Sequence, residues 1–242
     1  MGHLPGRGPS ASSESWRMNG THPRKPHDTT PIPEGNTFPP SLRDALQARL
    51  QSLSYGAFCL LVRHVLYQSG YTSVHAVGRL YRPDALPRPG GTQFNPHHGG
   101  LDLIALSHTD LATSLTLVQV KQYQQPVPRR YIDEMRGAMD RLGAEQGLIV
   151  SSGRFAGLAR DAAAIPHLRP VTPMDGWLLV TTMLTRRVGY GITGGSASKP
   201  ASKHHWKLDT EFFNDFEERC RRLERSSDGG EGDEFESMEG DA

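Results

Sequence analysis

The sequence G-G-L-D-L-I-A at 99–105 is followed, after a polar turn, by L-T-L-V-Q-V-K-Q-Y at 115–123. Both segments contain short apolar runs bounded by glycine or polar residues, which is typical of β-strands. We therefore predict two strands, 101–106 and 115–121, paired as a hairpin. Side chains two residues apart share one face of a strand, so Gln119 and Lys121 project together, while Val118 and Val120 face the packing on the other side.

The segments around the hairpin alternate between helical and strand patterns. The predicted helices are 41–53, 58–70, 128–142, 155–165, 175–183 and 208–223. The further predicted strands are 72–79, 147–151 and 169–172. Ser41, Asp175 and Thr210 are expected to cap helices, and Pro128 is expected in a first helical turn. This order predicts an α/β fold with a central mixed β-sheet flanked by helices, in which an antiparallel hairpin leads into a βαβ unit.

The composition divides the 242 residues into four parts. Residues 1–40 are rich in proline, glycine and serine and are expected to form a disordered tail. Residues 41–190 are long enough for one globular domain. Residues 191–225 are predicted to hold a linker and an amphipathic helix whose apolar stripe packs either in the core or in a dimer. Residues 226–242 contain seven acidic and no basic residues, which predicts a second disordered tail.

The formal net charge of +1 hides opposite charges along the chain. The globular part has a net charge of +6, and residues 191–242 have −6, counting Lys and Arg against Asp and Glu. Basic side chains neutralise phosphates, so the globular part suggests a polyanionic partner. A solvated surface is the competing interpretation.

The sequence also disfavours several classes of protein. The longest apolar runs are far shorter than the roughly 18 to 20 residues of a membrane helix, so no membrane association is expected. The first residues lack the apolar stretch of a signal peptide, which favours a cytoplasmic location. The two cysteines, Cys59 and Cys220, are far apart in the chain and predict neither a disulfide framework nor a metal site.

The hairpin brings charged groups together at the edge of a core. Asp102 lies in the first strand, and Gln119 and Lys121 end the second. Hydrolysis of a phosphodiester requires a cation at the phosphate, a carboxylate to hold the cation, and a group that orients or deprotonates water. Asp102 and Lys121 are the two charged candidates. The alternative is that they are an exposed turn residue and a strand-edge charge.

In these motifs the chain resembles a known family, the Mrr-type branch of the PD-(D/E)XK, or restriction-endonuclease-like, nucleases. The resemblance covers roughly residues 54–184 and implies that family's fold. It depends on the segments F-C-L-L-V-R-H-V-L-Y-Q-S-G-Y at 58–71, G-G-L-D-L-I-A at 99–105, V-Q-V-K-Q-Y at 118–123 and G-L-I-V-S-S-G-R-F at 147–155.

The resemblance implies a role for each motif residue. Asp102 is implied to be a Mg²⁺ ligand, Gln119 the second member of the site through its amide oxygen, and Lys121 the residue that positions and activates water. The backbone carbonyl of Val120 is a further implied ligand, and Mn²⁺ is expected to substitute for Mg²⁺. One departure is Cys59, which follows Phe58 where family members often have a glutamate.

Two groups of residues are candidates for DNA contacts. Ser151 and Ser152 lie in a polar turn before a predicted helix, where hydroxyls and free amides are able to hold a phosphate, or the serines are ordinary helix caps. Arg129 and Arg130 open the helix after the second hairpin strand. The competing account pairs arginines with acids at i, i+4 on that helix, namely Arg129 with Asp133, Arg130 with Glu134 and Arg136 with Asp140.

The leading functional prediction is therefore a Mg²⁺-dependent endodeoxyribonuclease with a role in restriction or defence against foreign DNA. Because two strands must be cut, a homodimer is expected. The alternative is a nuclease-fold module, weakened by Cys59, that binds DNA or a protein without cleavage. A third interpretation is an interaction protein that works through its acidic tail and C-terminal helix.

Overall fold

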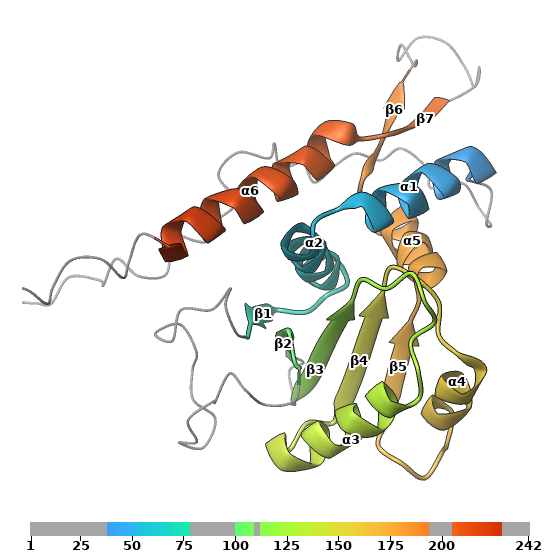
Figure 1. The fold of residues 1–242 in the computed structure, drawn as a ribbon, viewed down its shortest axis with the longest axis vertical. Coiled ribbons are helices and arrows are strands. Elements are labelled where there is room, and N and C mark those ends of the chain that lie inside the picture. The colour runs from blue at the N-terminus through green and yellow to red at the C-terminus, as the bar shows by residue number, and fades with distance from the viewer. Residues whose placement is uncertain (1–37, 78–99, 109–111, 194–204, 229–242) are drawn as a thin grey trace, which may run out of the picture. The chain divides into compact units, whose positions relative to one another are not determined.

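The predicted hairpin lies within a five-stranded sheet in the computed structural model, which describes residues 38–77, 100–108, 112–193 and 205–228 (Figure 1). The strand order is β1-β2-β3-β4-β5. Neighbours are antiparallel from β1 to β3 and parallel from β3 to β5, so the sheet is mixed, as predicted. The strands are β1 (Ser73–Ala76), β2 (Leu103–His108), β3 (Thr113–Lys121), β4 (Gln146–Ser151) and β5 (Val171–Met174).

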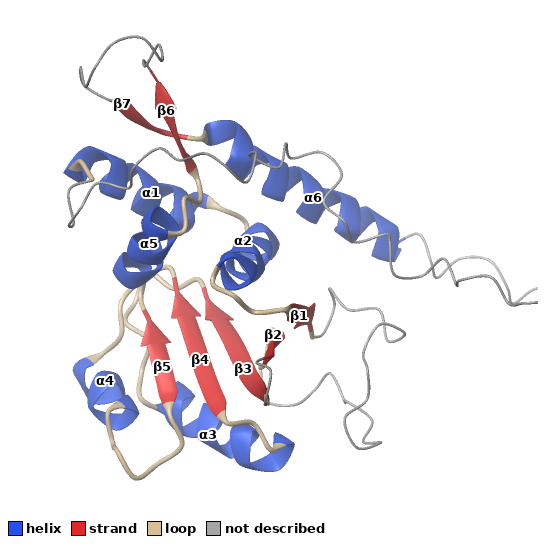
Figure 2. Ribbon diagram, turned by 180° about the vertical axis from the view of Figure 1, so that it is seen from behind, coloured by secondary structure: helices blue, strands red, loops and turns tan. Residues whose placement is uncertain are grey.

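Helices lie on both faces of this sheet (Figure 2). Their bounds are α1 (Pro40–Ser52), α2 (Tyr55–Gln68), α3 (Arg130–Leu142), α4 (Gly157–Ala163), α5 (Gly176–Thr185) and α6 (Thr210–Asp228). One core cluster joins α1, α2, α5 and α6 to the face of β3 that presents Val118 and Val120. A second cluster joins α3 and α4 to the opposite face, where Leu117 and Ile149 are buried. The predicted assignment of faces on β3 is confirmed.

The C-terminal part contains a small sheet that the sequence patterns do not predict. Strands β6 (Tyr190–Thr193) and β7 (His205–Leu208) pair antiparallel and lead into α6. The apolar stripe of α6 is buried within its own chain, because Phe213, Phe216 and Cys220 belong to the same core cluster as α2. Of the two predictions for this stripe, core packing is correct.

The ends of several helices differ from their predicted positions. Helix α1 begins at Pro40 after Pro39 and has no side-chain cap, so Ser41 is not its cap. Helix α3 begins at Arg130, which leaves Pro128 before the first turn. At the start of α6, the Asp209 carboxylate rather than Thr210 accepts a hydrogen bond from the Phe212 N–H at 3.0 Å. The predicted cap at Asp175 is confirmed, since its carboxylate accepts from the Leu178 N–H at 2.9 Å.

Several predicted features fall outside the described residues. These are residues 1–37 of the predicted N-terminal tail, residues 78 and 79 of a predicted strand, and residues 229–242 of the predicted acidic tail. Helix α6 extends to Asp228, so the first three residues of the predicted acidic tail are helical. Within the ranges that the structure describes, we find no helix with the length and apolar character needed to span a membrane.

Candidate active site

Strands β2 and β3 bring Asp102 next to the end of β3. The Asp102 N–H donates to the Val118 carbonyl at 3.0 Å, one residue before β2 begins. The N–H of Val120 donates to Oδ2 of Asp102 at 2.7 Å. The carboxylate therefore accepts a hydrogen bond from β3 just beyond the β2–β3 pairing, and this contact fixes the carboxylate beside the end of β3.

The second carboxylate oxygen of Asp102 is held by α2. Oδ1 accepts a hydrogen bond from the Tyr55 hydroxyl at 2.5 Å. Burial raises the pKa of Asp102 above its ordinary value of 3.8, although the hydrogen bonds from Tyr55 and Val120 and the positive charge of Lys121 act in the opposite direction. Tyr55 is absent from the sequence prediction because no pattern in the chain connects the start of α2 to the hairpin.

Cys59 follows Tyr55 by one helical turn and is buried. Burial raises the pKa of its thiol to about 12, with the negative charge of Asp102 as a further cause. The thiol is therefore neutral at neutral pH and contributes no charge to the site. Helix α2 therefore places a phenol and a neutral thiol near Asp102, and neither of these two side chains is a carboxylate.

Gln119 places an unsatisfied oxygen in the site. Its side chain is 2% exposed, and Nε2 donates to the Gly100 carbonyl at 2.9 Å. The oxygen Oε1 is buried and has no hydrogen-bond partner among the described residues. Gly100 has a φ of +71°, and a Cβ there would lie 2.9 Å from Nε2, so this turn requires glycine. An unsatisfied buried carbonyl oxygen is costly unless a ligand binds it.

The chemistry of these oxygen donors suits a hard divalent cation. The Val120 carbonyl lies on the β2 side of β3, where β2 has not yet begun, and its described side-chain contact is the Tyr55 hydroxyl at 3.4 Å. Mg²⁺ prefers oxygen ligands and usually keeps several waters. In the described part of the chain, no three His, Cys, Asp or Glu side chains gather. A cation here would therefore depend on Asp102, Gln119 Oε1 and the Val120 carbonyl.

Lys121 projects from β3 onto an aromatic residue of α3. Its Nζ lies 4.9 Å from the centre of the Tyr131 ring, which is within cation–π range. The Tyr131 hydroxyl forms hydrogen bonds with the Tyr123 hydroxyl at 2.8 Å and with the Arg130 guanidinium at 3.2 Å. These two hydrogen bonds lower the pKa of Tyr131. Tyr123 and Tyr131 are further site residues that the sequence analysis does not identify.

The arginines of α3 divide between surface and core. Arg129 pairs with Asp133 at 3.1 Å, so this i, i+4 pair is confirmed. Arg130 donates to Tyr131 and also lies over its ring, with the guanidinium carbon 5.0 Å from the centroid. The predicted pair of Arg136 with Asp140 is wrong, because Arg136 is buried and donates to the Ala162 and Arg169 carbonyls.

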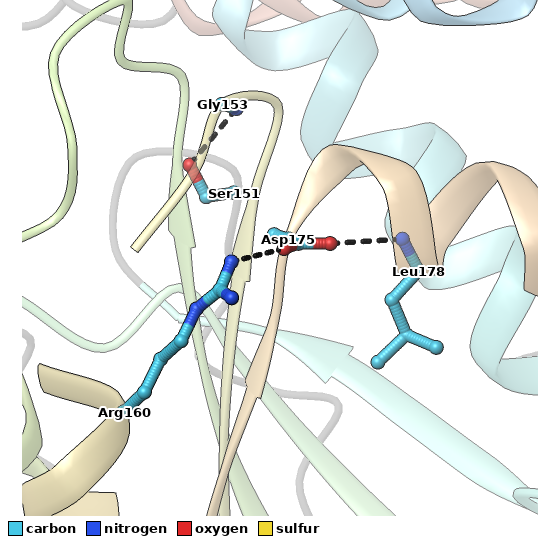
Figure 3. A network of polar contacts seen from close by, with 5 residues as sticks. All are labelled: Ser151, Gly153, Arg160, Asp175 and Leu178. Carbon is cyan, nitrogen blue, oxygen red and sulfur yellow. Dashed lines mark hydrogen bonds and ion pairs between the residues drawn. The ribbon is translucent and has the colours of Figure 1, made fainter. Parts of the chain in front are cut away.

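Ser151, the last residue of β4, and Ser152, in the turn that follows, are both buried. The Ser151 hydroxyl accepts a hydrogen bond from the Gly153 N–H at 3.1 Å (Figure 3). Helix α4 begins later, at Gly157 after Ala156, so neither serine caps it. Nearby, Arg160 of α4 pairs with the cap residue Asp175 at 2.8 Å, which ties α4 to α5 (Figure 3). We assign neither serine a phosphate contact, because both side chains are inside the protein.

Comparison with known families tests the resemblance. Residues 50–183 match the Mrr catalytic-domain model, which is described as a restriction endonuclease. The chain belongs to this restriction endonuclease family. The matched segment contains Asp102, Gln119 and Lys121 together with β2, β3 and α2, which are the elements that build the site.

Individual relatives are also restriction enzymes. The type IV methyl-directed restriction enzyme EcoKMrr of Escherichia coli (strain K12) is 28% identical over 173 residues, which are 72% of this chain and 49% of that protein. The chain thus spans about half the length of this curated relative.

Among solved structures, the DNA modification-dependent restriction endonuclease AspBHI aligns with a TM-score of 0.46 at 12% identity, covering 78% of this chain and 41% of that one. The MspJI restriction endonuclease, solved in complex with a 27-mer oligonucleotide, aligns with a TM-score of 0.39 at 20% identity, covering 60% and 30%.

Proposed function

We propose that the chain is a Mg²⁺-dependent endodeoxyribonuclease that hydrolyses DNA phosphodiester bonds in restriction of foreign DNA. The observation that supports this most directly is the unsatisfied, buried Gln119 Oε1 at the end of the strand that also places Val120 and Lys121 beside Asp102. Membership of a restriction endonuclease family supports the same reaction class.

Each residue of the site has a distinct proposed task. Asp102, Gln119 Oε1 and the Val120 carbonyl would hold Mg²⁺, which when bound would neutralise and polarise the scissile phosphate. Lys121, held over the Tyr131 ring, would contact the phosphate and orient the attacking water. Arg130, exposed at the start of α3, would contact a neighbouring phosphate of the same duplex, and Arg129 beside it would add positive charge.

Incubation with supercoiled plasmid tests the proposal. Nicking or linearisation is expected with Mg²⁺ or Mn²⁺ and not with a chelator, and Asp102→Ala and Lys121→Ala are expected to abolish it without unfolding the protein. Lys207→Ala is the matched control, because Lys207 is an exposed lysine of β7 outside the β2–β3 site. Cutting by both site variants at the parental rate would show that the residue assignment is wrong.

The assay should include methylated and unmethylated plasmid, since the curated relative is named as methyl-directed. Equal cutting of both would show that this chain does not share that preference. Cutting of the methylated plasmid alone would extend the proposal to modified DNA.

A second candidate function is supported by the neutral thiol of Cys59. Among the described residues, Asp102 is the one carboxylate that contacts the end of β3, and Cys59 is neutral. The site therefore has little negative charge with which to hold a cation. A nuclease-fold module that binds DNA or a protein without cleavage is therefore the alternative. It predicts salt-sensitive DNA binding and intact plasmid under every metal condition.

A further inference from the structure

The Tyr55 hydroxyl contacts two of the three oxygen groups in the candidate metal site. It donates to Asp102 Oδ1 at 2.5 Å and lies 3.4 Å from the Val120 carbonyl oxygen. Tyr55 is the first residue of α2, whereas Asp102 and Val120 belong to the β2–β3 region. One hydroxyl therefore connects a helix on one face of the sheet to both atoms.

The carboxylate of Asp102 is held by one donor on each oxygen. The Val120 N–H donates to Oδ2 and the Tyr55 hydroxyl to Oδ1. Each carboxylate oxygen has two lone pairs, so one on each remains available to a cation. Without the hydroxyl, the carboxylate would be held from the β3 side alone, by the single hydrogen bond from the Val120 N–H.

The Tyr55 side chain is placed for this contact and not for core packing. It is 47% exposed, among the most exposed large apolar side chains of the described residues. Its backbone is nevertheless well fixed. The adjoining Ser54 caps α2 and donates, through its N–H and its hydroxyl, to both carboxylate oxygens of Glu217 on α6, each at 2.8 Å.

We propose that Tyr55 is a positioning residue that orients the Asp102 carboxylate toward the cation, with α6 holding the start of α2 in place through Ser54. The inference rests on the proposed function, because it assumes that Asp102 binds a metal. Outer groups that orient a metal ligand typically contribute about 10- to 100-fold in metal affinity or activity.

The experiment is a calorimetric titration of the 242-residue chain with Mn²⁺. Tyr55→Phe is expected to weaken Mn²⁺ binding by about tenfold, because it removes the hydroxyl donor to Asp102 and leaves the ring in place. Tyr67→Phe is the matched control on the same helix. Its hydroxyl contacts the backbone N–H and carbonyl of Val74 on β1, at 3.1 and 3.2 Å, and the side chain is similarly exposed, so Mn²⁺ affinity should not change.

Two results would overturn the inference. If Tyr55→Phe binds Mn²⁺ as tightly as the parent protein, the hydroxyl does not position Asp102. If the variant binds more tightly, the hydroxyl competes with the ion for the place between Asp102 and Val120. Thermal melting of each variant without metal shows whether a change in affinity reflects loss of the fold.

Asp102→Ala separates failure of this inference from failure of the proposed function. When that variant loses Mn²⁺ binding and Tyr55→Phe matches the parent, only the positioning role is wrong. If Asp102→Ala binds Mn²⁺ normally, Asp102 is not a metal ligand, and the proposed role of Tyr55 is wrong as well. Cutting assays give a second measurement. In Tyr55→Phe, the metal concentration for half-maximal cutting should rise by the same factor as the dissociation constant for Mn²⁺. The rate at saturating metal should not change, because Tyr55 acts only through the metal ligand Asp102.

Discussion

Asp102 illustrates a conflict between the burial of a charge and its use as a ligand. Burial disfavours the carboxylate and raises its pKa, while two hydrogen bonds and the Lys121 ammonium favour it. Burial dominates, so the folded protein holds this proton more tightly than the unfolded chain does. The ionised carboxylate therefore costs stability above its ordinary pKa, and a bound cation would offset that cost.

This balance predicts a pH dependence for metal-induced stabilisation. Mn²⁺ should raise the melting temperature at neutral pH, and this increase should shrink progressively as the pH falls through the folded pKa of Asp102, which lies above 3.8, because protons compete with the metal for Asp102. Thermal melts with Mn²⁺ and with a chelator, down to about pH 3, measure it. Asp102→Asn should show no increase at any pH. A constant increase over the whole range would mean that the metal binds elsewhere.

Lys121 depends on an aromatic ring for its orientation. The ring of Tyr131 contacts both its ammonium group and the Arg130 guanidinium, so one side chain holds the two cations that we propose to contact phosphates. Cation–π contacts contribute from about 0.5 kcal/mol at exposed sites to about 2 kcal/mol when desolvated.

The ring and the hydroxyl of Tyr131 can be separated by mutation. Tyr131→Leu should lower the cleavage rate by about 2- to 30-fold through loss of the ring, whereas Tyr131→Phe should retain most of it. Single-turnover cutting of plasmid measures the rate. Tyr123→Phe, which removes only the partner hydroxyl, is the control and should resemble Tyr131→Phe. Equal losses in Leu and Phe variants would assign the effect to the hydroxyl instead of the ring.

The sequence predicts the candidate site residues that belong to one local motif, and misses the neighbours that helix packing brings to them. Gln119 and Lys121 lie two residues apart on β3, so alternation places them on one face, and Asp102, one residue before β2, contacts Val120 at the end of β3. Tyr55 and Tyr131 reach the site from helices. The positions of these two side chains depend on the angle at which α2 and α3 pack against the sheet, and no local sequence pattern predicts that angle.

Among the elements, the main sheet and the helices are well predicted, whereas the C-terminal strand pair is not. The six helices and the five strands of the main sheet all occur near their predicted positions. The four-residue strands β6 and β7 are missed because the segment between them, G-G-S-A-S-K-P-A-S-K at 194–203, has the glycine- and serine-rich composition of a linker. Arg136 is misassigned because i, i+4 spacing suggests an ion pair, whereas the fold provides carbonyl partners at Ala162, near the end of α4, and at Arg169, before β5 begins.

The contact between α2 and α6 offers a test at a single glycine. A Cβ at Gly56 would come within 3.0 Å of the Cys220 sulfur, so Gly56→Ala should destabilise the fold by about 1 to 3 kcal/mol despite the better helix propensity of alanine. Adding Cys220→Ala should restore much of the loss by removing the sulfur. Denaturant melts measure both. Gly157→Ala at the start of α4, where a Cβ would meet nothing within 4 Å, is the control, and a similar loss there would contradict the steric account.

The molecule as a whole has one set of Asp102, Gln119 and Lys121 within its described residues, and a DNA duplex has two strands. The apolar stripe of α6 is used inside the chain, so it does not provide a dimer surface. A single domain bound to a duplex can cut one strand, and cutting the other requires a second chain or rebinding in the opposite orientation. The expected homodimer would therefore form on DNA or through another surface.

This reasoning predicts how the products depend on protein concentration. Nicked circles should accumulate first at low concentration, and the rate of linearisation should rise more steeply than in proportion to protein, because two chains must act on one duplex. Gel quantification of nicked and linear plasmid across a dilution series measures both rates. Mixing the parent protein with excess Lys121→Ala is the control, since chains paired with the inactive variant should still nick but should linearise poorly. Linear DNA as the first product at the lowest concentration, with a rate proportional to protein, would show that one chain, or a dimer already formed in solution, cuts both strands.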